Sequence, residues 1–199
     1  MVKLKNALAA IGKKFYSRGW VMGTSGNFSA VSSRKPLRLV ISSSGVPKGE
    51  LTAASFLEVD ENAKPVGRTA LRPSAETQLH IVIARTRGAG AVLHTHSIWS
   101  TLLSDRHREQ DGLAISGLEM LKGLDGVKTH EHREWVPILP NSQDMTQLSA
   151  DLVRVLAAHP DAHGVLLAGH GLYTWGRTLA EAERHVEILE FLLEVTGRQ

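Results

Sequence analysis

The sequence of 199 residues contains no cysteine, so disulfide bonds and thiolate metal sites are excluded. Aromatic residues make up only 5% of the chain, and aliphatic side chains must therefore fill most of its core. No apolar run approaches the roughly 20 residues needed to span a bilayer. The formal net charge is only +3, with no basic stripe or arginine-rich tract. We expect a cytoplasmic protein that contacts neither membrane nor nucleic acid.

Apolar periodicity and turn residues predict short strands alternating with helices, in one domain that spans residues 1–199. Strand candidates lie at residues 28–32, 37–42, 56–60, 91–93, 135–138, 164–168 and 172–175. Helices are expected to end near Gly19, to run from an N-cap at Ser74 to about Arg87, to begin at Ile98, to follow residues 140–142, and to start at Thr178. Residues 105–112 are polar and predict a loop. This pattern predicts a layered α/β fold in which part of the sheet is antiparallel.

Histidine is the metal-binding residue type that stands out in this sequence, with ten copies. His94 and His96 follow a small apolar strand, and side chains two residues apart on a strand project from one face. His170 lies between two glycines directly after another apolar strand. Three such imidazoles predict a zinc site with one open position, the arrangement of a catalytic metal. The alternative for these three residues is buried histidines bonded to backbone carbonyls. A further pair, His130 and His132, lies among charged residues, which favour a solvated loop.

Five short segments, in this order, resemble the class II aldolase/adducin family: GTSGN (23–27), ISSSG (41–45), RPSAE (72–76), HTH (94–96) and GHG (169–171). The resemblance extends from about residue 5 to about residue 195. It implies an α/β fold, a three-layer α/β/α single domain with a largely antiparallel central sheet. It also implies one zinc ion per subunit, held by His94, His96 and His170, and a homotetramer.

The resemblance implies four phosphate-holding positions: Asn27, Ser44, Gly45 and Ser74. Backbone N–H groups in turns of glycine and serine supply donors to an anion, and a helix that begins at Ser74 would add its dipole. From the residues alone, ordinary turns and a helix cap are the alternative. Lys48 and Arg72 could add positive charge, although solvated surface is the commoner place for either residue type.

Two glutamates compete for the role of general acid/base. Glu76 occupies the acid/base position of the family's aldolases. Glu119 begins the segment EMLKGL (119–124), which resembles a segment of the family's dehydratases of a methylthio-substituted ketose phosphate. Relatives of those dehydratases vary at the position of Glu76, so Glu119 is ranked first. On sequence alone, either glutamate is more often a residue of a helix surface.

The resemblance therefore implies a zinc-dependent lyase of methionine salvage that removes water from a methylthio-substituted pentulose 1-phosphate. An aldolase or epimerase acting on another sugar phosphate, such as fuculose 1-phosphate, is the alternative enzyme. Aldolases of the family often use a tyrosine near the C-terminus, and no tyrosine follows Tyr173. A non-catalytic scaffold like adducin is a third alternative, which the presence of all three histidines disfavours.

Overall fold

Eight strands form one sheet in the computed structural model, which describes residues 1–199. The strands are β1 (Asn27–Arg34), β2 (Leu37–Ser42), β3 (Phe56–Asp60), β4 (Ala91–Thr95), β5 (Gly112–Ile115), β6 (Glu134–Leu139), β7 (Gly164–Leu167) and β8 (Gly171–Gly176). Their order across the sheet is β3-β2-β1-β4-β8-β7-β6-β5. Only the β6–β7 pair is parallel, so the sheet is mixed but largely antiparallel, as the resemblance implied.

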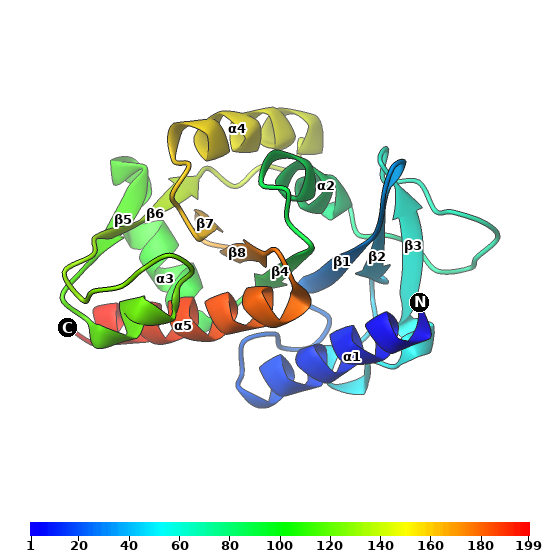
Figure 1. Ribbon diagram of the computed structural model, residues 1–199, viewed down its shortest axis with the longest axis horizontal. Helices are drawn as coiled ribbons and strands as arrows, with labels where there is room; N and C mark the ends of the chain where they lie inside the picture. Colours follow the sequence, from blue (N-terminus) through cyan, green and yellow to red (C-terminus); the bar gives the residue numbers. More distant parts are fainter.

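Helices cover both faces of this sheet. They are α1 (Val2–Ser17), α2 (Thr77–Thr86), α3 (Ile98–Arg106), α4 (Met145–Ala158) and α5 (Leu179–Arg198). Figure 1 shows α2 and α4 on one face and α1 and α5 on the other. The buried apolar clusters agree, because one unites α2 and α4 with the sheet while two others pack α1, α3 and α5 against it. The predicted three-layer α/β/α architecture is confirmed. None of the helices is long and apolar enough to cross a bilayer.

Strand alternation fixes where the β4 histidine points. Ala91 and Leu93 pack into the cluster with α1 and α5, whereas Val92 packs into the cluster with α2 and α4. Successive side chains on a strand point to opposite faces, so His94 shares the α2 face with Val92. Thr95 points the other way and donates a hydrogen bond to Glu190 of α5.

The helix boundaries follow local capping chemistry. Thr178 caps α5 as predicted, with its hydroxyl accepting the N–H of Glu181 at 3.1 Å. The prediction that Ser74 caps α2 is wrong, because the helix begins at Thr77. The hydroxyl of Ser74 instead accepts the N–H of Glu76, at 3.3 Å, within a turn that precedes the helix. This turn lets the carboxylate of Glu76 reach the sheet rather than solvent.

One strand was not predicted. β5 is only four residues long and lies at the edge of the sheet, where it pairs with β6 alone. It begins at Gly112, which the sequence placed at the end of a polar loop, and it is too short to show an alternating pattern.

Candidate metal centre

Four side chains from three separate parts of the chain meet at the end of β4. His94 lies on β4, His96 follows that strand, His170 lies in the turn between β7 and β8, and Glu76 directly precedes α2. One ligand atom of each lies within 4.8 Å of those of the other three. The Nε2 atom of His96 is 2.7 Å from that of His94 and 3.1 Å from that of His170. The structure thus brings the three histidines predicted as ligands together and places Glu76 beside them.

The imidazoles are oriented as neutral metal ligands. Nδ1 of His94 lies 2.9 Å from the carbonyl oxygen of Leu172, so Nδ1 donates its proton there and Nε2 turns its lone pair inward. Nδ1 of His170 faces the side-chain oxygen of Asn141 at 3.4 Å. Burial lowers the pKa of His94 well below its usual value and that of His96 to about 4. Because histidine binds metal in its neutral form, these residues fit a zinc ion.

Glu76 faces the histidines as a charged carboxylate. Its Oε1 lies 3.2 Å from Nε2 of His170 and 3.8 Å from Nε2 of His94. Its Oε2 accepts a hydrogen bond from the side-chain amide of Asn27. Burial alone would raise the pKa of Glu76, but its side-chain hydrogen bonds with His170 and Asn27 outweigh burial and hold the pKa well below its usual range. An ionised Glu76 can bind a metal ion or accept a proton, and it holds no proton to donate.

A buried chain of hydrogen bonds supports Glu76 from behind. The amide oxygen of Asn27 accepts a hydrogen bond from Nε2 of His80, and Nδ1 of His80 lies 2.8 Å from the hydroxyl of Ser29. Burial lowers the pKa of His80 to about 4, so the ring is neutral near pH 7. Neither His80 nor Ser29 was predicted from the sequence. The spacing of four residues between Glu76 and His80, which brings them together at the start of α2, is the one signal that could have found His80.

Tyr173 on β8 is a further supporting residue whose place was not predicted from the sequence. Its ring stacks on that of His94, with centroids 3.8 Å apart and planes at 10°. Tyr173 also meets His80 edge to face at 5.7 Å. The stacking contact fixes the ring plane of His94, the most deeply buried histidine of the centre.

A small polar cavity adjoins Glu76 and His96. Its volume is about 120 Å³ and none of its lining residues is hydrophobic. Three of the four predicted phosphate residues line it, namely Asn27, Ser44 and Ser74, whereas Gly45 does not border it. Pockets that enclose a whole ligand measure roughly 300–1,000 Å³. This cavity therefore suits one polar group of a ligand.

Lys48 supplies positive charge to the polar cavity, and its assignment to the solvated surface is wrong. Its side chain is only 1% exposed and lines the cavity. Burial is tolerated because Nζ donates to the carbonyl oxygens of Thr24, at 2.8 Å, and Val46, at 3.0 Å. Burial lowers the pKa of Lys48 to about 8, against the opposing effect of Glu76, so the ammonium persists near pH 7. Arg72 is exposed, as expected.

Glu119 is not one of the four clustered residues. It begins the short 3₁₀ helix η4 (Glu119–Gly123), and its side chain is 70% exposed. Its carboxylate pairs with Lys122 at 2.7 Å and lies 3.7 Å from His130. The hydrogen bond from Lys122 lowers the pKa of Glu119. The structure therefore leaves the role of Glu119 as a prediction and places Glu76 against the histidines.

The sequence is similar to known proteins over most of its length. The family model for the class II aldolase and adducin N-terminal domain matches residues 6–196. The methylthioribulose-1-phosphate dehydratase of Sorangium cellulosum (strain So ce56) is 42% identical over 90% of this chain and 84% of its own length. The enzyme of that name from Serratia proteamaculans (strain 568) is 45% identical over 96% of this chain and 92% of its own.

A solved structure shares the fold. The L-fuculose-1-phosphate aldolase from Thermus thermophilus superposes with a TM-score of 0.73 at 26% identity, covering 96% of this chain and 91% of its own. The family model and the curated relatives both extend over nearly the whole sequence. This chain belongs to the class II aldolase and adducin family.

Proposed function

We propose that this protein is a hydro-lyase of methionine salvage, which removes water from methylthioribulose 1-phosphate to give 2,3-diketo-5-methylthiopentyl 1-phosphate. The observation that carries the proposal is the convergence of His94, His96 and His170 on one point. This convergence occurs in a chain whose curated relatives at 42% and 45% identity are named for that dehydration.

We propose that His94, His96 and His170 hold one zinc ion per subunit. When bound, the ion would act as a Lewis acid that stabilises negative charge on the oxygens of the ketose. Glu76 lies close enough to Nε2 of His170 to share the ion or to face the substrate beside it. Tyr173 and the carbonyl of Leu172 would keep His94 in the ligating orientation.

The reaction requires that a proton leave C3 and that the C4 hydroxyl depart as water. We propose Glu119 as the first candidate for the general acid/base that helps the C4 hydroxyl to leave as water, and Glu76 as the second. Glu76 is held as a carboxylate, which suits it to accept a proton. Glu119 is exposed and paired only with neighbours on its own loop, so a proton can reach it from solvent.

We propose that the polar cavity binds the phosphate of the substrate. Asn27, Ser44 and Ser74 line it and would donate hydrogen bonds, and Gly45 would contribute through the shape of its turn. The buried ammonium of Lys48 supports this role, because it lines the cavity and would place a positive charge beside the anion.

We also propose a homotetramer located in the cytoplasm. Two apolar side chains one helical turn apart on α3, Ile98 and Leu102, are exposed, Ile98 by 70%. Ile98 lies two residues after His96, so a subunit contact there would adjoin the metal centre. Light scattering of the wild type and of Ile98→Asp tests this, with a tetramer expected for the first and smaller species for the second. An Ile98→Asp variant that remains tetrameric would remove α3 from the interface.

The test of the activity is incubation of the zinc-loaded protein with methylthioribulose 1-phosphate, with the product followed by absorbance and mass. A product lighter by one water and carrying a diketone is expected. A parallel incubation with fuculose 1-phosphate tests aldolase activity, which the likeness to the Thermus thermophilus enzyme keeps as the second candidate. Cleavage of fuculose 1-phosphate, without dehydration of the methylthio substrate, would contradict the proposal.

A further inference from the structure

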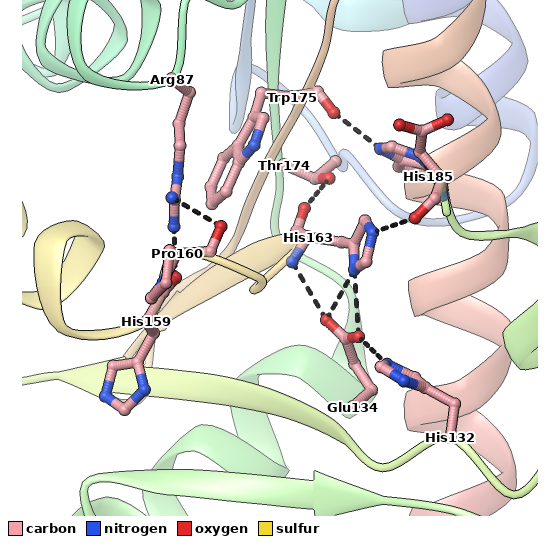
Figure 2. Close-up of polar contacts among 10 residues, drawn as sticks. Arg87, His132, Glu134, His159, Pro160, His163, Thr174, Trp175 and His185 are labelled. Carbon is pink, nitrogen blue, oxygen red and sulfur yellow. Dashed lines mark hydrogen bonds and ion pairs between the residues drawn. The ribbon is translucent and has the colours of Figure 1, made fainter. Parts of the chain in front are cut away.

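A second cluster of histidines lies at the end of the β7–β8 hairpin opposite the metal centre. His170 marks the turn between β7 and β8, whereas His163 directly precedes β7. His163, Glu134, His132 and His185 form the distal cluster, which Figure 2 shows between the sheet and α5. None of these residues belongs to the metal centre.

Glu134 is the acceptor at the middle of the distal cluster. It is the first residue of β6, and its side chain is 1% exposed. It accepts hydrogen bonds from the backbone N–H of His163 at 3.0 Å and from Nδ1 of the same residue at 3.0 Å. Nε2 of His132 lies 2.9 Å from Oε2 of Glu134, the oxygen that Nδ1 of His163 also contacts. A buried carboxylate requires hydrogen-bond donors around it.

Both ring nitrogens of His163 face acceptors. Nδ1 faces Glu134, and Nε2 lies 2.8 Å from the backbone carbonyl oxygen of Asp125. A carbonyl and a carboxylate only accept hydrogen bonds, so both contacts are satisfied together only when the ring carries two protons. The geometry therefore assigns His163 as an imidazolium, although its side chain is only 14% exposed.

His185 of α5, unlike His163, is a neutral imidazole. Its Nδ1 lies 2.8 Å from the carbonyl oxygen of Trp175 and donates to it. Its Nε2 then accepts the backbone N–H of Asp125 at 3.1 Å. The backbone of Asp125 is thus held from both sides, its N–H by His185 and its C=O by His163.

Asp125 belongs to the loop that carries Glu119. The loop comprises residues 116–133, between β5 and β6, and it is closed near its ends by the N–H of Gly117 bonding to the carbonyl of His130 at 3.0 Å. Its apolar side is buried through Leu121 and Leu124. Its polar side is fixed to the sheet and α5 by the two bonds to Asp125, six residues beyond Glu119.

We propose that His163, held as an imidazolium by Glu134, is a positioning residue that fixes the 116–133 loop and thereby the place of Glu119. This rests on the function proposed above, in which Glu119 transfers a proton. His163 touches neither the metal ligands nor the polar cavity and acts only through the loop.

Charged or titratable groups face His163 from the elements packed around it. Glu134 belongs to β6, while His132 and the carboxylate of Asp125 belong to the loop. His185 and Glu181 come from α5, and Arg177 pairs with both Asp125 and Glu181. Burial disfavours the charged ring, but the contacts with Glu134 and Asp125 outweigh it and raise the pKa of His163. The imidazolium is therefore present at low pH and is lost as the pH rises through this raised pKa.

The test uses three variants of the zinc-loaded protein. His163→Asn keeps an N–H at about the position of Nδ1 but has none that reaches Asp125. His163→Gln places an N–H nearer to the position of Nε2, and so offers partial rescue. His107→Gln is the matched control, because His107 follows α3 and its side chain bonds only to Gln110. Each is assayed for zinc content, for kcat and KM, and for amide hydrogen exchange along the chain.

We expect His163→Asn to retain its zinc and to exchange the amides of residues 118–127 faster, with little change elsewhere. We expect kcat to fall by roughly 10- to 100-fold, as for a displaced catalytic group, with a smaller effect on KM. His163→Gln should lie between this variant and the wild type, and His107→Gln should match the wild type. In the wild type, protection of the same amides should decrease as the pH rises, after correction for intrinsic exchange.

Unchanged amide exchange of the loop in His163→Asn would overturn the proposal, because it would show that His163 does not hold the loop in place. Faster exchange with an unchanged kcat would overturn it as well, because the position of the loop would not govern turnover. A wild-type protein that leaves methylthioribulose 1-phosphate intact would refute the proposed function instead. The exchange data would then decide by themselves whether His163 holds the 116–133 loop.

Discussion

Replacing Asn27 with alanine removes a side chain that makes two hydrogen bonds beside the metal centre. Its amide nitrogen donates to Glu76 and its amide oxygen accepts from Nε2 of His80. Asn27 is 4% exposed and His80 is fully buried. The variant would leave a carboxylate oxygen and a ring N–H without these partners, in a place where water enters poorly.

The structure sets the size of the expected effect. A buried polar group that loses its partner costs about 1–3 kcal/mol. Two such groups are created, but the side chain of Glu76 is 18% exposed and can regain a bond from water. We therefore expect Asn27→Ala to lower the free energy of unfolding by about 2–4 kcal/mol.

Urea unfolding of the metal-free protein, followed by circular dichroism, measures this difference without the contribution of metal binding. Asn62→Ala, in the exposed turn after β3, is the control and should change stability by less than about 0.5 kcal/mol. A similarly small change in Asn27→Ala would refute the bridging role of Asn27. Its contribution would then be confined to the phosphate binding proposed above.

Three further predictions concern single residues. His96→Ala should lose most of its bound zinc and its activity while remaining folded, and full metal occupancy in this variant would exclude His96 as a ligand. Glu119→Gln should keep its zinc but lose turnover, and normal turnover would transfer the proton-transfer role to Glu76 or to water. The pKa of His80 is lowered to about 4 by burial, whereas an unfolded histidine titrates near 6.5. The unfolded chain therefore binds the proton first, and the free energy of unfolding should fall as the pH drops from about 6.5 to about 4. His80→Gln should flatten this dependence in urea unfolding, and an unchanged slope would contradict a neutral His80.

Features that depend on neighbours in the chain could be predicted from the sequence. The cap at Thr178 and the β2 strand at residues 37–42 have the predicted positions, since their signals lie within a few residues. The N-cap of α2 was placed two residues early, at Ser74 instead of Glu76, because Ser74 has the residue type of a cap and its competing bond to Glu76 is not visible in a pattern. The order of the strands requires long-range pairings, such as β1 with β4, that no local pattern contains.

The metal centre and its surroundings show the same difference between local signals and long-range contacts. His94 and His96 could be predicted as neighbours because two residues on a strand share a face, and the glycines around His170 marked it as unusual. The burial of Lys48 could not be predicted, because it depends on carbonyl groups of Thr24 and Val46 that the fold brings to it. The pairing of Asn27 with His80 spans 53 residues, and no local pattern indicates it.

The proposed chemistry depends on three imidazole rings, brought together from β4 and the β7–β8 turn, that hold one catalytic cation. X-ray absorption at the zinc edge of the purified protein observes these ligands themselves. We expect one zinc per chain with three imidazole nitrogens at about 2.0–2.1 Å, plus one or two oxygen ligands. Zinc with fewer than three imidazole ligands, or a spectrum that does not change in His170→Gln, would contradict this assignment.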